Sequence, residues 1–180
     1  MNQRPPSPWV STVLLSVAAL TGCAGPRIQD YAQEQPRLDL KQYFNGPITA
    51  HGIFTDRQGK VVKRFVVAMQ AKWNGNEGTL DEHFTYSDGT KQQRIWHLTD
   101  IGQGRFIGKA SDVVGEAQGE SAGNALHWNY TLALPVDGHI WHVQFNDWMY
   151  LMDDHTMLNK AVMSKWGIQL GEVTLSFNKP

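Results

Sequence analysis

The sequence predicts an all-β protein, an antiparallel up-and-down meander of about nine or ten strands that closes into a barrel. From Ile48 onward, apolar and polar residues alternate with a period of two, which is the pattern of strands with one buried face. Turn signals rich in Gly, Asn and Asp interrupt this alternation at 56–59, 74–75, 88–89, 102–104, 123–124 and 137–138. A sheet built from so many short hairpins removes its exposed edges by closing on itself.

The alternation places the strands at 48–55, 61–73, 77–86, 91–99, 104–110, 115–121, 125–135, 139–151, 156–164 and 168–177. One segment has an alternative, since 156–166 also fits a short helix.

The turn at Asp137-Gly138 specifies the register of its hairpin. A two-residue turn there puts three apolar pairs on one face, namely Leu134 with Trp141, Leu132 with Val143 and Tyr130 with Phe145. A slip of one residue would bring polar side chains to that face, so the register is well specified.

The same rule orders the preceding strands. A turn at Asn74-Gly75 pairs Met69 with Leu80 and Val67 with Glu82. A turn at Asp88-Gly89 then brings Gln93, Ile95 and His97 onto the face of Glu82 and leaves Arg94 on the outer face with Arg64 and His83.

The first residues resemble a secretory leader. Arg4 precedes an apolar stretch at 13–20, and Leu20-Thr21-Gly22-Cys23 resembles the lipobox of bacterial lipoproteins. The resemblance implies a signal peptide at 1–22 and acyl chains on Cys23 that hold the protein on a membrane; Ala24 favours the outer membrane. The alternative is an ordinary cleaved signal with a chance cysteine.

Residues 23–45, with Pro26, Pro36 and several glutamines, are then a lipidated tether, and 46–180 form the barrel domain.

Composition excludes several classes of function. The net charge is −1 and no basic stripe is present, so nucleic acid is not an expected partner. Cys23 is the only cysteine, so no disulfide is expected. His139 and His142 are three residues apart on a strand and point to opposite faces, so they cannot share a metal ion, and no structural zinc site is expected. The segment from Asp147 to His155 is interpreted as an aspartate-rich turn after a strand, with a metal or acid–base cluster as the alternative. No cofactor-binding motif is present.

The candidate site residues lie on the apolar face. Glu82 stands there between Leu80 and Phe84, and the derived register offers His97 as its partner. Asp147 falls opposite Trp128, which a β-bulge at Asn146-Asp147 would explain. The residues expected to bind a ligand are Glu82, His97, Trp128, Tyr130, Trp141, Phe145 and Asp147. The alternatives are a satisfied buried pair or a rim position for Glu82, and packed core for the aromatic residues.

Four stretches carry a family resemblance: GIFTDRQGKVVKRFVV, LDEHFTYSDGTKQQRIWHL, GEAQGESAGNALHWNYTLALPVDG and FNDWMYLMDDHTMLNKAVMSKWGIQLGEVTLSF. Over roughly 38–180 they resemble an uncharacterised family of bacterial envelope lipoproteins that contains a domain of unknown function. The expected architecture also resembles that of lipocalins and fatty-acid-binding proteins, although the lipocalin motifs are absent. No catalytic residue is carried over from this resemblance.

The function expected from these features is that of an outer-membrane lipoprotein, facing the periplasm, that binds a fatty acid or another small apolar molecule in its barrel. A binding role is favoured over an enzymatic one. The first alternative is a lipid-modifying enzyme that uses Glu82 with His97, or the segment from Asp147 to His155, as acid and base. The second is an envelope scaffold with a filled barrel.

Overall fold

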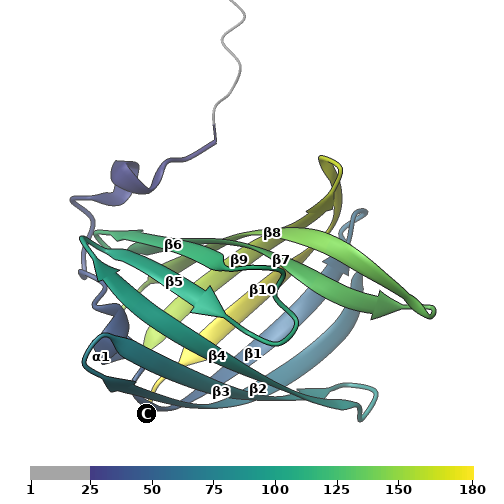
Figure 1. Cartoon of the computed structure of the whole chain (residues 1–180), viewed down its shortest axis with the longest axis horizontal. Helices are drawn as coiled ribbons and strands as arrows, with labels where there is room; N and C mark the ends of the chain where they lie inside the picture. Colours follow the sequence, from purple (N-terminus) through teal and green to yellow (C-terminus); the bar gives the residue numbers. More distant parts are fainter. Residues whose placement is uncertain (1–24) are drawn as a thin grey trace, which may run out of the picture.

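Ten antiparallel strands close into one barrel in the computed structural model, which describes residues 25–180 (Figure 1). Consecutive strands are neighbours throughout, and β1 pairs with β10 to complete the ring. The strands are β1 (Gly46–Asp56), β2 (Val61–Asn74), β3 (Glu77–Tyr86), β4 (Lys91–Gly102), β5 (Arg105–Lys109), β6 (Ala117–Ala122), β7 (Ala125–Val136), β8 (His139–Leu151), β9 (Thr156–Lys165) and β10 (Ile168–Asn178). The predicted fold class is confirmed. The helical alternative for 156–166 is wrong, because that segment forms β9. The predicted signal and Cys23 lie outside the described residues.

The β7–β8 hairpin has the predicted register. Asp137 and Gly138 both have positive φ, 49° and 77°, which is the pattern of a two-residue type I′ turn. Leu134 therefore lies opposite Trp141, Tyr130 opposite Phe145 and Trp128 opposite Asp147.

The β3–β4 hairpin differs from its prediction by one residue. Thr85 pairs with Lys91, and in the loop only Gly89 has positive φ, 84°, which is typical of a three-residue loop. A shift of one residue exchanges the two faces of a strand. Arg94 consequently lies opposite Glu82 on the inner face, and His97 lies on the outer face, so the predicted pairing of Glu82 with His97 is wrong.

Two smaller predictions about register are also wrong. The β2–β3 turn consists of Gly75-Asn76, which moves the pairing by two residues and places Met69 opposite Glu82. A shift of two keeps the same side chains inside, so the faces are as predicted. The pairing of β8 with both β7 and β9 runs through Asn146 and Asp147 without interruption, so no bulge lies there.

The N-terminal segment closes one end of the barrel, on the left in Figure 1. The short helix α1 (Leu40–Tyr43) begins at Asp39, whose carboxylate accepts the backbone N–H groups of two helix residues. Leu40, Tyr43 and Phe44 are buried among the ends of the strands. Part of the predicted tether is thus packed against the barrel. Within residues 25–180, no helix is long and apolar enough to cross a bilayer.

Hydrogen bonds fix this floor to the sheet. The Trp73 indole N–H donates to the carbonyl oxygen of Phe44 over 2.9 Å, and the Tyr43 hydroxyl donates to the carbonyl oxygen of His155 over 3.1 Å. Upstream, the 3₁₀ turn η1 (Ile28–Tyr31) packs Ile28 against Ala125 and Trp148 at the same end. The hairpins β1–β2, β3–β4, β7–β8 and β9–β10 surround the opposite end, which we call the mouth.

Replacement of Phe44 by Ala should lower the free energy of unfolding by about 3–5 kcal/mol, because it removes a buried ring and leaves a void in the floor. Urea denaturation measures the change. Gln42→Ala, two residues earlier and exposed, is the control and should stay within about 0.5 kcal/mol of the wild type. An equally small effect for Phe44→Ala would show that the floor does not contribute to the core.

Candidate ligand site

The barrel interior holds a cavity of about 410 Å³, which lies within the usual range for small-molecule sites. Leu40 and Phe44 form its floor, and inward-facing side chains from most of the strands form its wall. The wall is mainly apolar, with Phe65, Val67, Met69, Trp96 and Leu132 among its members. The interior is therefore only partly filled by side chains.

Glycine lets the largest wall residue lie flat against the sheet. The ring of Trp128 covers Gly108 and Gly119, and a Cβ atom at either glycine would collide with that ring. Trp128 also packs edge-on against Trp96, with ring centroids 6.0 Å apart. The small neighbours keep the indole at the wall and leave the centre of the barrel open.

Glu82 is buried in this wall. Within the described chain, no side chain gives its carboxylate a hydrogen bond of normal geometry. Burial raises the pKa of Glu82 to about 7. The Arg94 guanidinium and the Trp96 indole N–H oppose this rise, and the carboxylates of Asp112 and Asp147 add to it. The group therefore titrates near neutral pH and presents an acceptor to the cavity.

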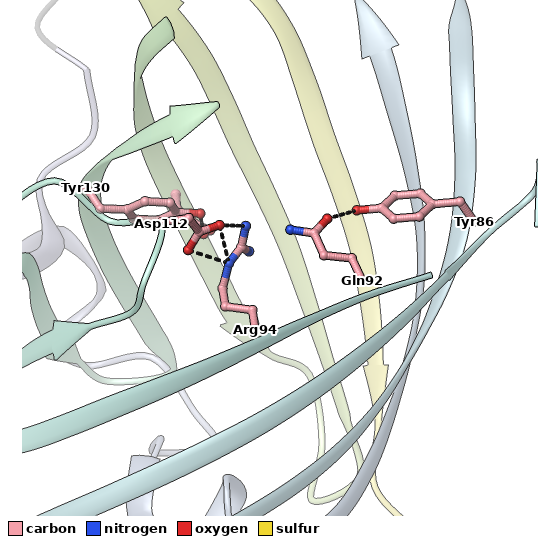
Figure 2. A network of polar contacts seen from close by, with 6 residues as sticks. Tyr86, Gln92, Arg94, Asp112 and Tyr130 are labelled. Atoms are coloured by element: carbon pink, nitrogen blue, oxygen red, sulfur yellow. Dashed lines mark hydrogen bonds and ion pairs between the residues drawn. The ribbon is translucent and has the colours of Figure 1, made fainter. Parts of the chain in front are cut away.

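Arg94 does not neutralise Glu82, because its charge is already paired (Figure 2). Its Nε donates to Asp112 Oδ1 and Oδ2 over 3.1 and 3.0 Å, and its Nη2 donates to Oδ2 over 2.7 Å. Asp112 lies in the β5–β6 loop, where its carbonyl oxygen accepts the N–H of Ala133 over 2.8 Å. This bidentate ion pair holds the β5–β6 loop against the wall of the cavity.

A second carboxyl group, Asp147, lies deeper among hydrogen-bond donors. The Tyr130 hydroxyl donates to Asp147 Oδ2 over 3.3 Å, and the Asn159 amide donates to Oδ1. Burial raises the pKa of Asp147 to about 7, although both hydrogen bonds lower it. The wall thus carries two carboxyl groups that titrate near neutrality and one guanidinium already engaged by a third carboxylate.

Five of the seven predicted ligand-binding residues line this cavity: Glu82, Trp128, Tyr130, Phe145 and Asp147. Two do not. His97 is exposed on the outer face of β4, because the register of the β3–β4 hairpin differs by one residue from the predicted one. Trp141 faces inward but stands at the mouth, where it is 39% exposed and outside the cavity lining.

The aspartate-rich segment after β8 proves to be a turn. The Asp153 carboxylate accepts the N–H groups of His155 and Thr156, and the segment is exposed. Among residues 25–180, no three or more His, Cys, Asp or Glu side chains gather as metal ligands would.

Sequence reasoning missed Arg94, Asp112 and Asn159. A signal existed for Asn159, since strand alternation puts it between Met157 and Ala161, both buried. Arg94 was assigned to the wrong face. Asp112 lies in a loop, where no periodicity applies.

Fold and site together define a closed ten-stranded antiparallel barrel with a cavity of small-molecule size. The chain belongs to the family described as "Protein of unknown function (DUF3833)", whose model matches residues 17–179. No curated protein matches it.

The solved structures that are similar to the chain include two that illustrate the range of the likeness. One is a protein of unknown function from the DUF3598 family of Nostoc punctiforme, with 8% identity and a TM-score of 0.56 over 82% of this chain and 51% of that one. The present chain therefore spans about half the length of that protein. The other is a de novo designed fluorescence-activating β-barrel, with 16% identity and a TM-score of 0.41 over 79% of this chain and 99% of that one. The first likeness concerns the fold alone.

Glu82→Gln should reduce the pH dependence of stability. A carboxyl whose folded pKa is about 7 and whose ordinary pKa is 4.5 stabilises the fold below pH 4.5, and that contribution is lost as the pH rises through 7. Between pH 4.5 and 7, the free energy of unfolding of the variant should therefore fall by roughly 2–3 kcal/mol less than that of the wild type. Urea denaturation at both ends of the interval measures the difference. Equal losses in the two proteins would contradict the assignment of a raised pKa to Glu82.

Proposed function

We propose that the protein binds a small, mostly apolar molecule in its barrel, a fatty acid or another lipid of comparable size. The observation that carries this proposal is the cavity of about 410 Å³ with its apolar wall and a few polar groups at fixed positions. A barrel whose task is only to hold its shape would gain stability by filling that space, because each empty methyl-sized void costs about 1 kcal/mol.

The polar wall groups favour a particular head group. An ionised carboxylate in the cavity would meet Glu82 and Asp147. The two cations of the lining are already paired, Arg94 with Asp112 over 2.7 Å and Lys63 with Asp88 over 3.4 Å. An alcohol or amine would instead donate a hydrogen bond to Glu82. We therefore place a molecule with a donor head group first. A fatty acid fits when the wall carboxyl groups, or the ligand itself, carry a proton.

The two alternatives have less support. Glu82 and His97 lie on opposite faces of the sheet, and the segment from Asp147 to His155 divides between the interior and an exposed turn. Neither set brings an acid and a base to one substrate. The scaffold alternative requires a filled barrel, whereas the interior holds a cavity of about 410 Å³. Arg94, which was expected on the outer face with Arg64 and His83, points inward.

We also propose that Cys23 is acylated and anchors the protein to the outer membrane on its periplasmic side. The lipobox-like sequence before Cys23 supports this. The described chain begins two residues later, and its first segment packs on the closed end of the barrel.

A panel of ligands with one chain length tests the proposed head group. The soluble form that starts at Ala24 keeps the whole barrel, floor and core, which lie within residues 25–180. Displacement of a fluorescent apolar dye should rank dodecanol and dodecylamine at least about tenfold above dodecanoate at pH above 7. As the pH falls through about 7, dodecanoate should gain affinity, because Glu82 and Asp147 become protonated.

Glu82→Gln should reduce this discrimination, whereas His83→Gln, its neighbour on the outer face, should leave it unchanged. A preference for dodecanoate at high pH would overturn the head-group assignment. Failure of all three ligands to bind, with no lipid extracted from the purified protein, would overturn the binding function.

Cys23→Ala should abolish the incorporation of labelled palmitate, since the thiol is the site of acylation. Ala24→Asp should keep the label but move the protein from outer to inner membrane fractions. Labelling that persists in Cys23→Ala would contradict the anchor.

A further inference from the structure

Large apolar side chains are exposed on one side of the mouth. Three hairpins that are neighbours around the barrel carry them, namely β7–β8, β9–β10 and β1–β2. We call this set the apolar rim; it comprises Val61, Val62, Val136, Ile140, Trp166 and Ile168. Trp166, Ile140 and Ile168 are 82%, 63% and 60% exposed, values far from those of a packed core. Exposed large apolar side chains that gather on neighbouring hairpin tips are typical of an interaction site.

The opposite side of the mouth differs in composition. The β3–β4 tip consists of Ser87, Asp88, Gly89 and Thr90, and the β5–β6 loop carries Asp112 in its ion pair with Arg94. Only Val114 is a large exposed apolar residue there, among the described residues. The apolar surface is therefore confined mainly to one side.

Trp166 occupies a position that folding alone does not favour. It has φ of 52° at the β9–β10 turn, a left-handed conformation in which Asn or Gly is the usual residue. A bulky residue with positive φ is strained, and at 82% exposure its ring gains little from packing within the barrel. The sequence keeps a tryptophan where neither turn geometry nor core packing calls for one, which indicates a contact outside the chain.

The charges around the rim are mainly positive. Residues 56–63, 135–142 and 164–169 hold Arg57, Lys60, Lys63 and Lys165 against Asp56 and Asp137, although the whole chain has a net charge of −1. Lys63 pairs with Asp88 of the β3–β4 tip over 3.4 Å, which leaves three cations without a carboxylate partner from that tip. The Asp56 carboxylate also accepts hydrogen bonds from backbone N–H groups of its own turn. Lys165 lies over the rings of Trp141 and Trp166, 4.7 and 4.8 Å from their centroids.

We propose that the apolar rim docks on a lipid membrane surface that carries anionic head groups. Tryptophan with neighbouring lysine is suited to this place, since the ring enters the interface while the ammonium group reaches the phosphates. Each basic residue near an anionic surface adds to the attraction. A second copy of the chain would instead bring its own basic rim against this one.

The rim is also continuous with the cavity. Leu134 and Met163, just inside the β7–β8 and β9–β10 tips, belong to the cavity lining. The docking proposal rests on the surface alone and does not depend on which ligand, if any, the barrel holds.

Flotation with vesicles tests the proposal in the form that starts at Ala24, which lacks any acyl chain. The probes are vesicles of phosphatidylethanolamine with phosphatidylglycerol, and vesicles of phosphatidylcholine as the neutral comparison. The wild type should float with the anionic vesicles, and Ile140→Ser with Trp166→Ser should reduce the bound fraction at least about tenfold. Met152→Ser with Leu158→Ser, at residues that are 53% and 42% exposed and remote from the mouth, is the control and should float like the wild type.

A second readout locates the contact. Brominated lipids should quench tryptophan fluorescence of the wild type, and Trp166→Phe should lose most of that quenching while it still floats. Three results would overturn the proposal: no flotation of the wild type, equal flotation of the rim and control variants, or a rim-dependent dimer in light scattering with no affinity for vesicles. Far-ultraviolet circular dichroism verifies that each variant is folded.

Discussion

The pairing of β1 with β10 is the constraint on which the rest of the structure depends. It joins the first and last strands along eight residues, from Thr49 opposite Asn178 to Asp56 opposite Gly171. The pairing gives every strand two neighbours and leaves no free edge to aggregate. Closure also turns one face of the sheet into an interior. Because the backbone groups of the wall are satisfied by the ladders, the inward side chains need not fill the whole space.

The sequence predicts the positions of the strands well. It predicts which side chains of a strand face inward only where the length of the adjoining turn is known. Asp137-Gly138 and Asp88-Gly89 are the same dipeptide, and both end a strand of alternating residues. The first forms a two-residue turn with both φ positive, whereas in the second only Gly89 is left-handed and the loop has one more residue. That single residue decides whether Arg94 or His97 faces inward. Local sequence did not distinguish the two loops, since both are compatible with Asp-Gly.

The candidate site was predictable to the same extent. Glu82 and Asp147 were detected as polar exceptions to an apolar alternation, which is a signal that a single strand carries. The Arg94–Asp112 pair needs the fold of a loop between β5 and β6 and the correct face of β4, and neither follows from periodicity. The pair changes the chemistry of the cavity. Without Asp112, the free guanidinium would favour a carboxylate ligand. With Asp112 present, the wall groups that lack an opposite charge as ion-pair partner are the carboxyls of Glu82 and Asp147.

Features that cost folding stability are concentrated at the cavity and the mouth. Two buried carboxyl groups with raised pKa, an unfilled interior and an exposed tryptophan in a left-handed turn each oppose folding. At the closed end, the helix is capped, Phe44 is buried and the tyrosine and tryptophan side chains of the floor are hydrogen-bonded. Sequences usually depart from local consistency at functional positions and recover the stability elsewhere. The asymmetry between the two ends therefore assigns the structural role to the floor. The residues of the wall and the mouth therefore serve a role other than the stability of the fold.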